Sequence, residues 1–109
     1  MEARILPACP VETTLTLISN KWKVLIIRDL LPGTKRFGEL KKSIGSVSQK
    51  VLTAQLRQME ESGLLTRTVY PEVPPRVEYT LTELGQSLRP VLDALKNWGE
   101  EYKAKMSGE

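Results

Sequence analysis

The chain has 109 residues, of which 40% are hydrophobic and 27% charged, with no histidine and a single cysteine, Cys9. This length fits one domain with one small core, and this composition excludes collagenous, disordered and disulfide-stapled proteins. The longest strictly aliphatic run, residues 24–27, is far shorter than the roughly 20 apolar residues of a membrane helix. We therefore expect a single cytoplasmic domain over residues 1–109, with no membrane segment and no secretory signal.

The missing residue types exclude most catalytic chemistry. The chain has no HExxH motif, no CxxC pair, no histidine-based triad and no Cys-His dyad. Residues 33–38 match neither common phosphate-binding loop, so we predict a turn there. Adjacent carboxylates such as Glu60 and Glu61 point about 100° apart on a helix and cannot share a substrate. We expect no catalytic residue, no metal ligand and no cofactor, and hence no enzyme.

Positive charge is concentrated in one third of the chain. Residues 21–59 hold nine basic and two acidic side chains, a local balance of +7, whereas the whole chain carries +3. A localised basic patch is typical of a polyanion site, although on charge alone a solvated basic surface is an equally good explanation.

Helical periodicity predicts four helices in the first part of the chain. Apolar side chains recur at helical spacing over residues 10–19, 22–31 and 37–44. Ser48 is a good N-cap for a fourth helix, which ends before Gly63. One face of this fourth helix is an apolar stripe, and the opposite face is cationic or small, without acids: Lys50, Thr53, Ala54 and Arg57.

Two strands and a long helix follow. Residues 64–70 and 77–81 are predicted to form a hairpin around a proline-rich loop. Thr82 then caps one final helix over about residues 82–104, bent locally by Pro90.

An apolar seam runs along this final helix. A domain of this size has little core left to cover so long a stripe, so we expect it to pack against a second copy of the chain. The residues assigned to dimerisation on this helix are Leu88, Val91, Leu95, Trp98 and Tyr102.

This order of elements is that of a winged helix-turn-helix: mainly α with a small β-hairpin, and with N- and C-terminal dimerisation helices around a DNA-binding core over about residues 20–82. A helix fits the major groove of B-DNA, where its first side chains reach base edges while nearby Lys and Arg neutralise phosphates. Double-stranded DNA is therefore the expected partner.

Short motifs, in order over about residues 9–99, make the chain resemble the HxlR-type transcriptional regulators, winged-helix relatives of the MarR group. Each motif is weak alone, but the ordered set is specific. The resemblance implies a homodimeric DNA-binding regulator, dimerised through the last helix and through the first helix, which carries Leu15. It also implies that the fourth helix lies in the major groove and that the hairpin is the wing. The motifs are Cys9-Pro10, Lys21-Trp22, 36–40 (RFGEL), 48–53 (SQKVLT), 63–67 (GLLTR), 74–82 (PPRVEYTLT), Gly85 and Trp98-Gly99.

The candidate DNA contacts lie on three elements. On the fourth helix and the turn before it, the candidates are Ser46, Ser48, Gln49, Lys50, Thr53 and Arg57, with Ser48 first of all a cap. Arg36 and Lys41 are expected to meet phosphates. Arg67 and Arg76 flank the wing, where they can reach the minor groove or a phosphate, although cross-strand pairing with Glu78 explains Arg67 equally well.

In several members of the family that this chain resembles, a Cys-Pro pair before the first helix senses oxidants or electrophiles, and Cys9-Pro10 matches it by position. A lone cysteine is also common as an unreactive small hydrophobe, so both roles stay open for Cys9. We expect a transcription factor that acts as a repressor. The sequence does not indicate which small-molecule effector, if any, it binds. The alternative is a winged-helix protein-interaction module without DNA binding.

Overall fold

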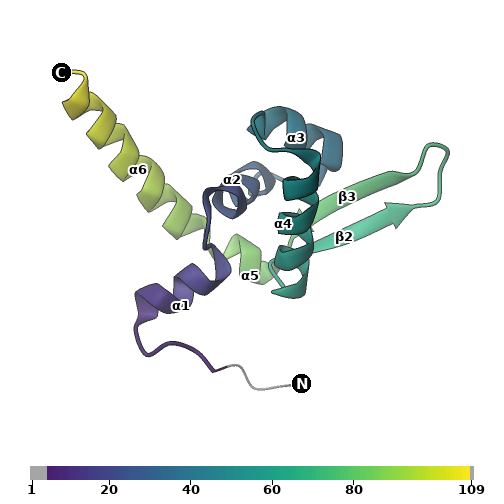
Figure 1. Ribbon diagram of the computed structural model, residues 1–109, viewed down its shortest axis with the longest axis horizontal. Helices are drawn as coiled ribbons and strands as arrows, with labels where there is room; N and C mark the ends of the chain where they lie inside the picture. Colours follow the sequence, from purple (N-terminus) through teal and green to yellow (C-terminus); the bar gives the residue numbers. More distant parts are fainter. Residues whose placement is uncertain (1–4, 109) are drawn as a thin grey trace.

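The computed structural model describes residues 5–108, so residues 1–4 and 109 of the expected domain lie outside the described part. None of the described helices is both long and apolar enough to cross a membrane. The elements follow one another in this order (Figure 1): α1 (Pro10–Leu17), α2 (Lys21–Leu30), β1 (Lys35–Arg36), α3 (Phe37–Ile44), α4 (Gln49–Glu61), β2 (Leu65–Tyr70), β3 (Arg76–Leu81), α5 (Glu83–Gln86) and α6 (Arg89–Met106).

The core lies where α2, α4 and the sheet meet. α2 contributes Ile26, Ile27 and Leu30, all fully buried, so this helix is central to the core. α4 turns its apolar stripe inward, as its periodicity predicts, and its opposite face stays in solvent. The stripe consists of Leu52, Leu56 and Met59.

Caps of the predicted types set the ends of α4 and α5. The Ser48 hydroxyl accepts a hydrogen bond from the Val51 N–H (3.1 Å), and the Thr82 hydroxyl accepts one from the Gly85 N–H (3.2 Å). Gly63 follows α4 with a φ of +81°, a conformation that favours glycine and ends the helix. The start and end of α4 therefore follow from local sequence, and with them the placement of its outer face.

The strands form one antiparallel sheet in the order β1, β3, β2. β2 and β3 pair along their whole lengths, which confirms the predicted hairpin, and this wing extends away from the helices (Figure 1). Across β3 from β2, Lys35 pairs with Tyr79 and Arg36 with Glu78. The prediction that residues 33–38 form only a turn is wrong, because pairing with a distant strand makes two of them β1.

The final helix is interrupted, which corrects the prediction of one bent helix over 82–104. α5 ends after one turn and α6 begins at Arg89, with Leu88 in its N-cap position. Pro90 lies in the first turn of α6. N–H groups in the first turn make no hydrogen bond within the helix, so a proline, which has no N–H, costs no hydrogen bond there. Pro90 therefore starts a helix instead of bending one, and α6 projects away from the rest of the molecule (Figure 1).

Candidate nucleic-acid interface

The outer face of α4 brings together the side chains expected at its DNA surface. Ser48 lies just before them, and its hydroxyl is used in capping the helix. The remaining members are exposed and line one shallow groove along the helix: Gln49, Lys50, Thr53, Ala54 and Arg57.

A second cleft, of about 340 Å³, separates α4 from the sheet. It brings Arg67 of β2 to the same opening as Arg57 of α4. The alternative explanation for Arg67, cross-strand pairing with Glu78, is wrong. Arg67 lies opposite Tyr79, and the Glu78 carboxylate faces Arg76. The full lining is Phe37, Gln49, Thr53, Arg57, Glu60, Arg67 and Tyr79.

The groove along the outer face of α4 is lined by no acidic side chain, as expected, but Glu60 lies beside it on the edge of the helix that faces the sheet. The exposed Glu60 carboxylate lines the second cleft together with Arg57 and Arg67. This position of Glu60 was not expected because only the packing of the sheet beside α4 makes that edge of the helix a cleft wall. Along α4, the basic side chains of Lys50 and Arg57 therefore precede the acids Glu60 and Glu61 at its C-terminal end.

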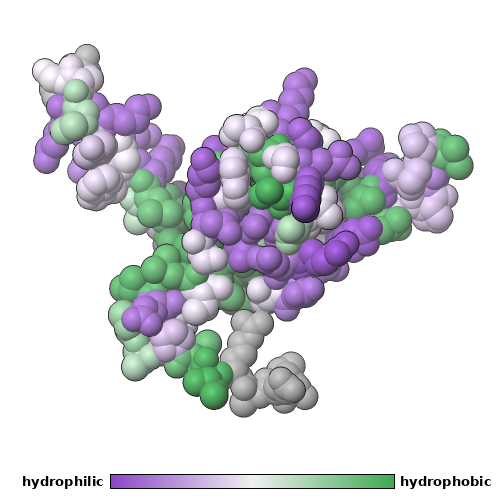
Figure 2. Space-filling model, viewed as in Figure 1, coloured by the Kyte–Doolittle hydropathy of each residue, from purple (hydrophilic) through white to green (hydrophobic). Residues whose placement is uncertain are grey.

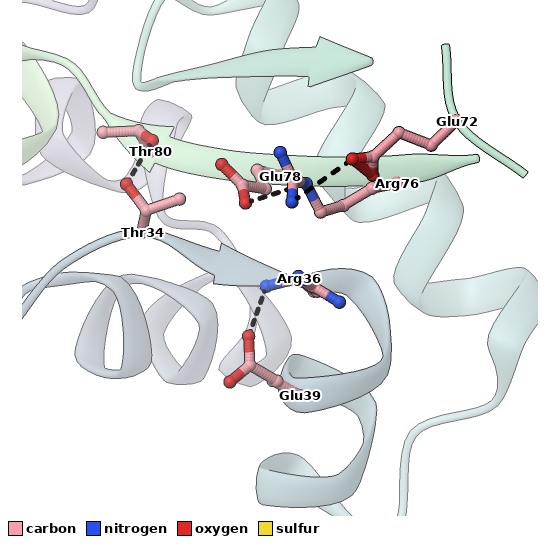
Figure 3. A network of polar contacts seen from close by, with 7 residues as sticks. All are labelled: Thr34, Arg36, Glu39, Glu72, Arg76, Glu78 and Thr80. Atoms are coloured by element: carbon pink, nitrogen blue, oxygen red, sulfur yellow. Dashed lines mark hydrogen bonds and ion pairs between the residues drawn. The ribbon is translucent and has the colours of Figure 1, made fainter. Parts of the chain in front are cut away.

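Arg36 joins a third cleft, between α3 and the wing, of about 650 Å³. Its backbone N–H donates to the Glu39 carboxylate at 2.8 Å, which stabilises the first turn of α3, and its side chain is exposed (Figure 3). Lys41 is half-buried on α3 and Ser46 is exposed in the turn, and neither lines any of these three clefts of the described chain. The structure thus gathers most of the candidates and leaves these two aside.

Arg76 lies among contacts within the wing. Its guanidinium is 3.6 Å from a Glu72 carboxylate oxygen and 3.4 Å from one of Glu78 (Figure 3). It also lies over the Tyr70 ring, at 4.1 Å from the centroid. The side chain is 29% exposed. Two carboxylates therefore offset the one positive charge that β3 brings to the wing.

An apolar surface remains uncovered on the far side from the wing. Leu95, Trp98 and Tyr102 of α6 are 51%, 67% and 50% exposed, and the Trp98 and Tyr102 rings stack with centroids 5.3 Å apart. Leu15 of α1 is exposed as well, and Figure 2 shows hydrophobic side chains gathered around α1 and the base of α6. Leu88 is instead buried in the core of its own chain, because the break before α6 turns it inward.

Cys9 is exposed and occupies the N-cap position of α1. Its carbonyl oxygen accepts the Thr13 N–H at 3.0 Å, while its side chain makes no capping hydrogen bond. Over the described residues, no group of three or more His, Cys, Asp or Glu side chains could hold a metal ion.

Known proteins are similar to this chain in both sequence and fold. The chain is 49% identical over 98 residues to the HTH-type transcriptional regulator YdeP of Bacillus subtilis, covering 90% of this chain and 77% of the relative. It is 51% identical over 94 residues to an HTH-type transcriptional regulator of Methanothermobacter thermautotrophicus, covering 86% and 72%. Among solved structures, the redox regulator HypR in its reduced form matches with a TM-score of 0.84 and 42% identity, covering 93% of this chain and 100% of that one.

The family match spans the whole winged helix-turn-helix. Residues 17–107, from the end of α1 to the end of α6, match the family described as HxlR-like helix-turn-helix. The elements described above, a helix-turn-helix with a basic outer face followed by a wing, are those that such regulators use on DNA. The chain therefore belongs to the HxlR-like helix-turn-helix family of transcriptional regulators.

Proposed function

We propose that this protein is a homodimeric repressor that binds a specific double-stranded DNA operator through α4 and the wing. The observation that carries the proposal is the continuous exposed face of Gln49, Lys50, Thr53 and Arg57, joined across a cleft by Arg67. Side chains at the start of a recognition helix recognise bases through bidentate or charged hydrogen bonds to base edges, and arginines beside the helix bind phosphates.

The dimer is supported by the exposed apolar surface. Leu95, Trp98 and Tyr102 share one side of α6, and a groove of about 560 Å³ beside them is lined by Pro90, Val91 and Ala94 in addition to Leu95 and Trp98. An isolated protein rarely leaves so contiguous an apolar patch in water. A two-fold dimer through this surface presents two copies of α4, and we expect half-sites about one helical turn, roughly 10 bp, apart.

Selection of bound sequences from a random DNA pool, at a stated salt concentration, tests the proposal. We expect an inverted repeat to be enriched, and affinity for it to fall steeply with salt, with a slope of about −0.9 in log K against log[salt] for each neutralised phosphate. Failure to retain any DNA at low salt would instead support the alternative, a protein-interaction module that uses the same fold.

Alanine at Lys50 or Arg57 is expected to weaken binding to the selected sequence by about 1 to 3 kcal/mol for each lost base contact. Binding to a random duplex should change less, because a base contact contributes only on the correct sequence. Titrations of both duplexes with each variant measure the difference, and Lys103→Ala, which removes a charge from α6, is the matched control. Equal losses on the two duplexes would assign these residues to phosphates.

We further propose that oxidation of Cys9 controls DNA binding. The thiol is exposed at the start of α1, and the similar protein HypR is described as a redox regulator. Cys9 is the chain's only cysteine, so its disulfide can form only between subunits or with a small thiol. Either product would displace α1 and, through the dimer, the spacing of the two α4 helices.

Diamide treatment is expected to change operator affinity for the wild type and to leave Cys9→Ser unchanged. Affinity is measured for both proteins before and after treatment, followed by reduction with a dithiol to restore the starting value. A wild-type affinity that does not respond to diamide would make Cys9 a structural residue.

A further inference from the structure

The outer half of the wing has little support from the rest of the fold. At its base, β1 adds a third strand opposite Glu78 and Tyr79, and the Thr34 and Thr80 hydroxyls are hydrogen-bonded at 2.7 Å (Figure 3). Beyond Glu78 only two strands remain, and a two-stranded hairpin alone is marginally stable in water. Something other than the sheet must therefore hold the wing tip in place.

Arg76 lies two residues beyond the end of the third strand, at the outer end of β3, and it contacts one residue each of the loop, β2 and β3. Glu72 belongs to the loop, Tyr70 to the end of β2 and Glu78 to β3, and the guanidinium meets all three. Its Nε is buried and lies 3.4 Å from Glu78 without hydrogen-bond alignment, so this contact is an ion pair. A planar guanidinium can stack on a ring and face two carboxylates at once, which an ammonium cannot.

We propose that Arg76 is a positioning residue that fixes the wing for DNA, and that it does not itself neutralise a phosphate. Residues 71–75 contain no basic side chain, and Val73 at their centre is fully exposed. Apart from the Glu72 carboxylate, which faces Arg76, the tip offers the minor groove the apolar shape of Val73 and its neighbouring prolines, and its orientation depends on the contacts of Arg76. This inference rests on the proposed DNA binding, of which it specifies one element.

Removing the charges of Glu72 and Glu78 distinguishes a positioning role of Arg76 from a phosphate contact, because the two roles predict opposite changes in DNA affinity. Under the positioning role, Glu72→Gln/Glu78→Gln weakens binding to the selected duplex by roughly fivefold, the scale of a partly exposed ion pair, although it removes two negative charges. If Arg76 instead contacts a phosphate, the same variant frees its charge and binding becomes tighter, which overturns the proposal. Glu100→Gln/Glu101→Gln on α6 is the control for the change in net charge.

The salt dependence of Arg76 variants gives a second criterion. Arg76→Ala and Arg76→Lys should both weaken binding with an unchanged salt slope, and hydroxyl-radical protection should be lost only at the duplex flanks. A merely destabilised fold would lose protection everywhere. A slope reduced by about 0.9 in Arg76→Ala, and restored in Arg76→Lys, would identify a phosphate contact and overturn the proposal.

Amide hydrogen exchange in the free protein makes the test independent of DNA binding. The amides of the six non-proline residues in 69–77 should exchange faster in Arg76→Ala and Arg76→Lys than in the wild type, while α2 and α4 keep their protection. Unchanged exchange over 69–77 overturns the proposal even if the protein binds DNA. A wild type that binds no duplex overturns the DNA role, and the exchange result then reports separately whether Arg76 orders the wing.

Discussion

Replacing Leu95 with glutamate is expected to convert the proposed dimer into a folded monomer and to lower operator affinity by about 100-fold or more, since two linked half-site contacts become one. The side chain is 51% exposed in the chain and lies beside the Trp98 groove, so the substitution leaves the core of the monomer intact. In the proposed dimer the new carboxylate would be buried without a partner. Light scattering gives the mass, and titration of the selected duplex gives the affinity.

Asn97→Glu provides the matched control for this experiment. Asn97 is exposed on the other side of α6 from Leu95, two residues along, and its substitution adds the same charge. It should leave both the mass and the affinity close to wild type. If the wild type already has the mass of one chain, or if Leu95→Glu remains dimeric, the proposed dimer surface is wrong.

Alanine at Gly85 should destabilise the fold by about 3 kcal/mol or more, because the added methyl group has no space. A Cβ there overlaps the carbonyl oxygen of Leu64 and lies 2.9 Å from Cδ2 of Leu81. That carbonyl also accepts the Thr82 N–H at 3.0 Å, so neither backbone segment can move without loosening the join between the sheet and α5. Urea unfolding at a fixed protein concentration measures the free energy of unfolding.

Gly38→Ala is the control, because it introduces the same methyl group into open space on α3. It should be neutral or stabilising by up to about 1 kcal/mol, the difference between glycine and alanine in a helix. Equal stability of the two variants would mean that α5 can shift away from Leu64 at little cost. Gly85 would then have no structural role in the join.

Local interactions made much of the fold predictable from the sequence. The period of apolar residues located α2 and α4, and Ser48, Gly63 and Thr82 marked helix ends, because a helix and its caps depend on residues within one or two turns. The hairpin followed in the same way from alternation around a proline-rich loop. The outer face of α4 needed only the helical repeat and the knowledge of which side is apolar.

Contacts between residues far apart in the chain could not be predicted from local sequence. β1 exists only because Lys35 and Arg36 meet β3, more than 40 positions later, and the break before α6 places Leu88 in the core where periodicity had continued the helix. The register of β2 on β3 decides that Arg67 lies opposite Tyr79 and reaches the cleft beside α4, whereas Arg76 and Glu78 share a face of β3 because they are two residues apart on the same strand. The sequence by itself therefore determined α2, α4, the hairpin and the outer face of α4. Only the tertiary structure decided that Arg67 shares a cleft with Arg57 and Glu60, because a pairing register is set by the packing of the whole sheet and not by any one segment.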